Sequence, residues 1–415
     1  MKKYAIGLDY GTLSVRALLL NLATGEEMAS SVYEYPHGVM DAEIPGGKKI
    51  PSDFALQHPQ DYLDGMVNSV RSVMEKVQIL PEQIAGIGID FTSSTVMPVT
   101  EDATPLCLCE GFRENPHAYV KLWKHHGGEE EAALIDRIAV EQGEKWHPIY
   151  GGKVSGEWMM PKILETIHKA PEVYSAAYRY IEALDWVTWK LTGTLSISEC
   201  LAGYKAFYHE GDGYPAPEFF KALHPAMENV ISEKIAAPLK KIGETAGRLT
   251  AEAAEILGLP EGTPVAVGMI DAHASVLGSG ISKPGTMMVI AGTSSCHMVL
   301  AETESGIPGV GGLVKDGIFP GYYGYEGGQS CVGDHFAWFV EHCVPECYAR
   351  EAAERKMNLH QLLTDKLKDY KAGQSGLLAL DWFNGVHLLS SQFPSPRHRE
   401  WFLLILHLIL CLSTN

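Results

Sequence analysis

The chain has 415 residues, a formal net charge of −18, 46% hydrophobic residues and 20% charged residues. That length predicts two or three domains, and the composition is typical of a soluble globular protein. The strong negative charge argues against a nucleic-acid or anionic-membrane partner, although a local positive pocket can still bind a nucleotide.

The cysteines and the two most apolar stretches predict a cytoplasmic protein. Eight cysteines are scattered along the chain without a C-x-x-C pair, which is typical of a reduced protein. The N-terminal Met-Lys-Lys and the apolar residues after it imitate a signal peptide. However, Asp9 and Arg16 interrupt the run, and no cleavage site follows. The apolar stretch 401–412 is too short to span a bilayer.

Residues 4–20 consist of two apolar runs of strand length around a polar corner, which predicts a β-hairpin. Gly11 allows close backbone approach, and Thr12 with its neighbouring N–H groups can face an anion. Asp9, at the end of the first run, can hold a hydrated Mg²⁺. An ordinary hairpin with an acid in its turn remains the alternative.

The following residues predict an α/β lobe. A third strand is expected over 27–35, followed by a helix that opens at His58-Pro59 and has apolar residues at helical spacing. A buried strand over 84–91 leads through 92–95 into another strand. Strand, helix and strand in this order indicate an α/β arrangement.

Helices are expected through the middle of the chain. Trp158, Met159 and Ile163 share an apolar helix face. We interpret the neighbouring Lys162 as either a solvated charge or a ligand contact. A helix over 182–193 ends at a glycine stop signal. We interpret the pair His125 and His126 as polar groups at a helix end rather than metal ligands, because no cysteine or acid cluster supports a metal site.

Two features mark the second half. An apolar strand over 265–269 brings Asp271 to the start of a helix, where it can act chemically or as an N-cap. Residues 287–300 repeat the strand, Gly-Thr-Ser corner, strand pattern of the N-terminus, with Gly292, Thr293 and Ser294 at the corner. Thr250 is expected to cap the helix that ends at Gly258, and helical patterns return over 331–370.

The two glycine corners and the acid between them resemble, as a set, the actin-like phosphotransferase fold, and within it the FGGY family of carbohydrate kinases. The resemblance implies an α/β, two-lobed actin-like (ribonuclease H-like) fold, with ATP and Mg²⁺ as cofactors. It makes Asp9 the residue that holds Mg²⁺ through water, and Asp271 the catalytic base and a sugar contact. The residues implied to bind the ATP phosphates are Gly11, Thr12, Ser14, Arg16, Gly292, Thr293 and Ser294.

Three stretches, 88–92, 115–126 and 155–162, are similar to the ribulokinases of that family. This similarity implies phosphorylation of L-ribulose to L-ribulose 5-phosphate in L-arabinose catabolism, and it admits a homodimer. It makes Ser93, Lys205 and Glu326 sugar-binding residues. From the residues alone, Lys205 can equally be a surface lysine, and Glu326 a turn acid before a helix near Cys331.

Three other functions remain open at this point. The first is a kinase for another ketopentose or a polyol, and the second is a non-catalytic fragment that binds sugar. The third is an actin-like or chaperone-like ATPase, which the stretches around Lys205 and Glu326 disfavour.

The predicted organisation is an N-terminal kinase lobe over 1–283, a partial C-terminal lobe over 284–385 and an aberrant tail over 386–415. Glu400 is the only acid in the last thirty residues of an otherwise acidic chain. This break in composition suggests the hypothesis of a frameshift near residue 385, which leaves the second lobe incomplete. The family's adenosine-binding loop is implied to lie in the missing part.

Overall fold

The computed structural model describes residues 3–292, 294–329, 331–371 and 373–376. By compactness the chain divides into two units. The first comprises Met1–Met288 and Met298–Glu326, and the second comprises Val289–His297 and the chain from Gly327 onward. The proposed lobe boundaries at 283 and 385 therefore stay predictions, and the tail over 386–415 lies outside the described residues.

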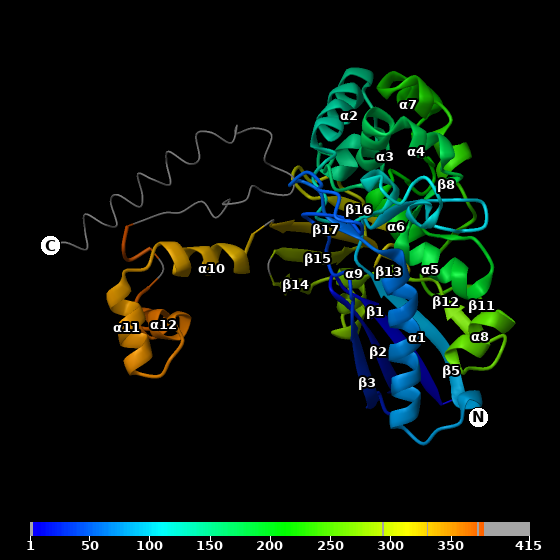
Figure 1. Ribbon diagram of the computed structural model, residues 1–415. Coiled ribbons are helices and arrows are strands. Elements are labelled where there is room, and N and C mark those ends of the chain that lie inside the picture. Colours follow the sequence, from blue (N-terminus) through cyan, green and yellow to red (C-terminus); the bar gives the residue numbers. More distant parts are fainter. Residues whose placement is uncertain (1–2, 293, 330, 372, 377–415) are drawn as a thin grey trace. The chain divides into compact units, whose positions relative to one another are not determined.

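A mixed seven-stranded sheet forms the centre of the first unit (Figure 1). Its strands run in the order β11-β12-β5-β1-β2-β3, and β13 also pairs with β5. β1, β12 and β13 are parallel to β5, whereas β1–β2, β2–β3 and β11–β12 are antiparallel. The strands are β1 (Tyr4–Tyr10), β2 (Ser14–Asn21), β3 (Glu27–Glu34), β5 (Ile84–Phe91), β11 (Thr245–Arg248), β12 (Pro264–Ala266) and β13 (Met269–Ile270).

Alternating burial explains the first two strands, and it confirms the predicted hairpin. In β1 the side chains of Ile6, Leu8 and Tyr10 are buried, and β2 repeats this pattern. Helix α1 (Pro59–Lys76) packs on β2 and β3, with Pro59 in its first turn as expected. Gly65 permits this contact, because a Cβ there would lie 2.5 Å from Val15 Cγ1.

The rest of the first unit is largely helical. A four-stranded sheet has the order β4 (Leu56–Gln57), β7 (Val120–Lys121), β6 (Val96–Val99), β8 (Arg179–Glu182), and β9 (Ile197–Ser198) pairs with β10 (Leu239–Lys240). Thr250 caps α8 and Gly258 ends it, as predicted. The helices are α2 (Glu129–Gln142), α3 (Met159–Lys169), α4 (Pro171–Ala176), α5 (Ala183–Thr192), α6 (Glu199–Lys205), α7 (Pro217–Leu223), α8 (Ala251–Leu257) and α9 (Asp271–Gly278).

The expected continuous strand over 265–269 is wrong. The segment forms two short strands, β12 and β13, separated by Val267 and Gly268. Gly268 lies against the side chain of Leu184 and the carbonyl of Ile89, where a Cβ would not fit. The chain therefore shifts between the two strands before α9 begins at Asp271.

The last elements confirm the strand, corner, strand repeat and the helical pattern after it. A four-stranded sheet has the order β14 (Met287–Ala291), β15 (Ser295–Ala301), β17 (Tyr323–Gln329), β16 (Gly312–Lys315). Helices α10 (Gly333–His342), α11 (Glu346–Glu354) and α12 (Leu359–Leu367) follow. Within the described part of the chain, no helix combines the length and apolar character that crossing a bilayer requires.

Candidate active site

Three aspartates lie at the carboxyl ends of three parallel strands. Asp9, the second-to-last residue of β1, pairs with Asp90 of β5, and Met269 of β13 pairs with the same Asp90. Asp271 comes directly after β13 and is the first residue of α9. Because carboxyl ends of parallel strands meet at one edge of a sheet, this register gathers the three carboxylates.

The acids influence one another electrostatically. Burial, with smaller contributions from the charges of Asp9 and Glu326, raises the pKa of Asp271 to about 7. A hydrogen bond from the Ala272 N–H and the charge of Lys205 oppose this increase. Burial, followed by the charges of Asp9 and Asp271, raises the pKa of Asp90 to about 8.

The first glycine corner is a tight turn in which the hydroxyl group of Thr12 can donate a hydrogen bond. The Gly11 N–H donates to the Ser14 carbonyl at 2.9 Å, and Arg16 on β2 lies 4.0 Å from the Asp9 carboxylate. The Thr12 hydroxyl oxygen accepts a bond from Trp123 Nε1 at 3.1 Å. Since that bond uses an oxygen lone pair, the Thr12 O–H can still donate to an anion.

The second corner has a similar bond, but its two partners lie one residue closer in the sequence. The Gly292 N–H donates to the Ser294 carbonyl at 2.8 Å, and the Gly292 carbonyl accepts from the Gly333 N–H at 2.9 Å. Both corners thus join two strands through a bond from a glycine N–H to a serine carbonyl. Thr293 lies outside the described residues.

Lys205 and Glu326 form a buried ion pair, with 2.7 Å between Lys205 Nζ and Glu326 Oε1. The other oxygen, Oε2, lies 3.0 Å from His273 Nε2. Burial favours a raised pKa for Glu326, but Lys205 and then His273 hold that pKa well below its usual range. Two alternatives from the sequence are therefore wrong: Lys205 is not on the surface, and Glu326 lies in strand β17 rather than in a turn.

Ser93 lies in a turn whose backbone is hydrogen-bonded by two buried charged side chains, Lys162 and Glu182. Lys162 Nζ donates to the Ser94 carbonyl at 2.5 Å and to the Leu122 carbonyl at 2.7 Å, and Glu182 Oε2 accepts from the Thr95 N–H at 2.8 Å. Ser94 itself has a φ of 54°. The reading of Lys162 as a solvated charge is wrong, since its side chain reaches back across the core to these carbonyls.

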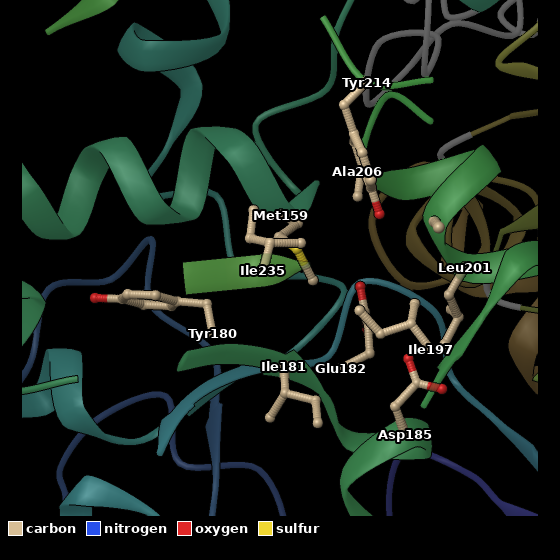
Figure 2. Close-up of a pocket in the computed structure, with 11 residues that line it drawn as sticks. Met159, Tyr180, Ile181, Glu182, Asp185, Ile197, Leu201, Ala206, Tyr214 and Ile235 are labelled. Carbon is tan, nitrogen blue, oxygen red and sulfur yellow. The ribbon is translucent and has the colours of Figure 1, made fainter. Parts of the chain in front are cut away.

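A small cavity is lined by Glu182 together with Met159, Tyr180 and Tyr214 (Figure 2). Its volume of about 10 Å³ suits one water molecule and excludes a sugar. Within the described residues, Glu182 Oε1 and the Tyr214 hydroxyl are buried without a hydrogen-bond partner. Burial raises the pKa of Glu182 to about 7, against the opposing charge of Lys162.

The structure corrects the predicted environment of His125 and excludes a metal site at two other histidines. His125 is not a polar group at a helix end, because it is fully buried, packs on Phe54 and bonds to Glu165 at 2.9 Å. Among the described residues, His37, His58 and Asp61 have donor atoms close enough to share a metal ion. However, the His37 and His58 rings stack nearly parallel at 4.2 Å, so both in-plane lone pairs cannot reach one ion.

Comparison with known proteins identifies the family. Residues 4–278 match the N-terminal domain of the FGGY family of carbohydrate kinases, and residues 287–392 match its C-terminal domain. The chain belongs to the FGGY family of carbohydrate kinases. The kinase family implies ATP as the phosphate donor and a sugar alcohol group as the acceptor.

Individual relatives agree with this FGGY assignment. The ribulokinase of Bacillus licheniformis is 48% identical over 374 residues, which cover 90% of this chain and 68% of the relative. The ribulokinase of Geobacillus thermodenitrificans is 47% identical over 386 residues, covering 92% and 68%. The gluconate kinase of Lactobacillus acidophilus shares the fold, with a TM-score of 0.73 at 17% identity, covering 93% of this chain and 70% of that one.

Three residues of this FGGY site were missed by sequence reasoning. Asp90 lies one residue before the end of a predicted strand, and its alignment with Asp9 follows from the parallel register of β1 and β5. His273 lies two residues after Asp271, a spacing that gave no sign of its bond to Glu326. Cys200, which contacts His273 at 3.3 Å, carried no signal in the sequence.

Proposed function

We propose that this chain transfers the γ-phosphate of ATP to the terminal hydroxyl of L-ribulose and releases L-ribulose 5-phosphate and ADP. The proposal rests mainly on Asp271. It is a partly buried acid with a raised pKa that interacts electrostatically with both members of the Lys205–Glu326 pair. A base beside a donor and an acceptor for hydroxyl groups suits a polyhydroxy substrate. The names and high identity of the ribulokinase relatives support L-ribulose as that substrate.

Asp271 is the proposed general base. The hydroxyl oxygen of the sugar attacks the γ-phosphorus, its proton passes to the Asp271 carboxylate, and the bond from the γ-phosphorus to the ADP oxygen breaks. A base with a pKa near 7 is half ionised at neutral pH and accepts this proton better than an ordinary aspartate. Lys205 and Glu326 would orient the sugar by donating to one hydroxyl and accepting from another. Ser93 is a further proposed sugar contact.

Asp9 and Asp90 are the residues proposed to hold Mg²⁺, directly or through water. Oxygen donors suit this hard cation. Burial, followed by the charges of Asp9 and Asp271, raises the pKa of Asp90, and a cation would compensate the negative charge there. When bound with ATP, Mg²⁺ neutralises charge on the phosphates. The donor set therefore fits the ion.

The two glycine corners are the proposed phosphate contacts. Backbone N–H groups near Gly11 and Gly292, and the hydroxyls of Thr12, Ser14, Thr293 and Ser294, are donors of the kind that phosphate oxygens accept. Arg16 is proposed to add positive charge next to Asp9. A homodimer and a cytoplasmic location stay predictions.

A substrate panel tests the proposed function. ADP release is measured with ATP and Mg²⁺ in the presence of L-ribulose, D-xylulose, ribitol or no sugar, and ³¹P NMR identifies the product. We expect ADP release that requires sugar and is fastest with L-ribulose. Faster turnover of another sugar would favour a different ketopentose or polyol kinase. Thermal stabilisation by L-ribulose without any ADP would indicate a sugar-binding fragment that does not transfer phosphate.

A further inference from the structure

Cys200, His273, Glu326 and Lys205 form a continuous chain of polar contacts from the interior to the candidate sugar site. Cys200 Sγ lies 3.3 Å from His273 Nδ1, His273 Nε2 lies 3.0 Å from Glu326 Oε2, and Glu326 Oε1 lies 2.7 Å from Lys205 Nζ. Cys200 and His273 are fully buried, whereas Glu326 is about one-fifth exposed. A substrate hydroxyl group can therefore approach this chain at its Lys205–Glu326 end.

The donors along this chain can be assigned from chemistry. The Glu326 carboxylate accepts, so His273 Nε2 carries the hydrogen. A neutral imidazole then has a bare Nδ1, which needs a donor, and the thiol S–H of Cys200 is in contact with it. Burial lowers the pKa of His273 and raises the pKa of Cys200 to about 12, so both groups are neutral and this order of donors is self-consistent.

We propose that His273 is a positioning residue for the sugar site, and that the Cys200 thiol fixes the tautomer in which His273 donates to Glu326. The carboxylate of Glu326 is thereby held with one oxygen on His273 and the other on Lys205. In this orientation Lys205 and Glu326 present a donor and an acceptor to adjacent sugar hydroxyls. Cys200 acts on sugar recognition without touching the sugar.

The surroundings leave His273 little other freedom. The Tyr204 ring lies 4.4 Å from the imidazole, and the Tyr204 hydroxyl donates to the Gly324 carbonyl at 2.7 Å. Several titratable groups from other elements interact electrostatically with this chain and with Tyr204 beside it, namely Asp185 from α5, Glu182 from β8, Tyr150, and Asp271 from α9. If the imidazole turned its bare nitrogen toward Glu326, two acceptors would face each other, and the carboxylate would lose a donor.

The kinetic test compares Cys200→Ala, Cys200→Ser and His273→Gln in the full chain, and it rests on the proposed function. We expect Cys200→Ala to raise the KM for L-ribulose about tenfold, because one hydrogen bond to a charged group is weakened. The kcat and the KM for ATP should stay within about twofold. Cys200→Ser keeps a donor and should restore most of the affinity. Cys107→Ala, at another buried cysteine, controls for general loss of packing.

The pH dependence separates positioning from packing. In the unsubstituted chain the Glu326 pKa lies low because Lys205 and His273 stabilise its charge against burial. Weakening the His273 bond raises that pKa, so in Cys200→Ala the sugar KM should increase more steeply as the pH falls from 8 to 6. A KM and pH profile identical to those of the unsubstituted chain would overturn the positioning role.

Nitrogen-15 NMR of the histidine rings provides a test that does not depend on turnover. We expect His273, assigned by its loss in His273→Gln, to remain neutral with hydrogen on Nε2 from pH 5.5 to 8.5. Cys200→Ala should populate the Nδ1–H tautomer. Titration of His273 near 6.5, or an Nδ1–H ring in the unsubstituted chain, would contradict the proposal. If L-ribulose proves not to be a substrate, this spectrum still decides the role of His273.

Discussion

Asp271 shows how position determines the chemistry of a single residue. Its carboxylate follows strand β13, accepts a bond from the Ala272 N–H at 2.7 Å and shares the sheet edge with two further acids. The sequence offered catalysis and helix capping as its two roles. The N-cap of α9 is Ile270 and the helix begins at Asp271, so the capping role is wrong, whereas the carboxylate remains a candidate base.

Turnover should follow the ionisation of Asp271. Its pKa is raised from 3.8 to about 7, so below pH 7 most molecules carry a protonated base that cannot accept the proton of the sugar. We expect kcat with L-ribulose to fall about tenfold per pH unit below pH 6.5 and to level off above pH 8. A pH–rate profile at saturating substrates checks this. A profile that stays level down to pH 5 would mean that the base titrates normally.

Asp90→Asn should stabilise the fold at alkaline pH and weaken the binding of Mg²⁺. Because the folded pKa of Asp90 is about 8 and its ordinary value is 3.8, the folded chain binds this proton more tightly, and stability falls as pH rises between these values. An uncharged asparagine removes this penalty. We expect a melting temperature about 2–4 °C higher at pH 8.5 and unchanged at pH 4.

The same variant should need severalfold more Mg²⁺ for half-maximal ADP release, because one proposed oxygen donor is less negative. Asp102→Asn, at an exposed turn acid, is the matched control and should change neither quantity in this way. An unchanged Mg²⁺ requirement would remove Asp90 from the proposed metal-binding residues.

At the scale of elements, buried charges fix the turn between β5 and β6. Helix α3 contributes Lys162 and strand β8 contributes Glu182, and both bind backbone groups of residues 94–95. Burial lowers the pKa of Lys162 and raises that of Glu182, while each charge favours the ionised form of the other. The turn that carries Ser93 therefore depends on two distant elements.

Lys162→Met should destabilise the chain by about 3–5 kcal/mol, because it leaves Glu182 buried without its cation and the carbonyls without a donor. Urea unfolding measures this change. The double variant Lys162→Met with Glu182→Gln should recover part of the loss, since no uncompensated charge remains. Lys190→Met, at an exposed lysine, should have an effect within about 0.5 kcal/mol. Equal losses in the single and double variants would contradict the coupling.

Sequence periodicity predicted the elements that depend on local patterns. Alternating burial produced the hairpin of β1 and β2, and Pro59 and Thr250 marked the starts of two helices. Features that depend on distant neighbours were not accessible. Glu326 lies in a strand because β17 pairs with β16, where it faces Gly312, and Gly268 breaks a strand because Leu184 packs against it.

At the scale of the whole molecule, the candidate site was predicted in part. The three motifs that led to the FGGY family also contain Asp9 and Asp271, so the chemistry could be inferred before the fold. The buried network of Lys205, Glu326 and His273 joins residues more than fifty positions apart and emerges only from tertiary structure. The chain spans about two thirds of the length of the ribulokinases that it matches.

The most direct test of this account is ADP release by the unsubstituted chain and by Asp271→Asn, measured with ATP, Mg²⁺ and L-ribulose beside calorimetric binding of the sugar. The account predicts sugar-dependent ADP release that falls at least about a hundredfold in Asp271→Asn, while the Kd for L-ribulose changes less than about tenfold. Turnover by Asp271→Asn close to that of the unsubstituted chain would contradict it.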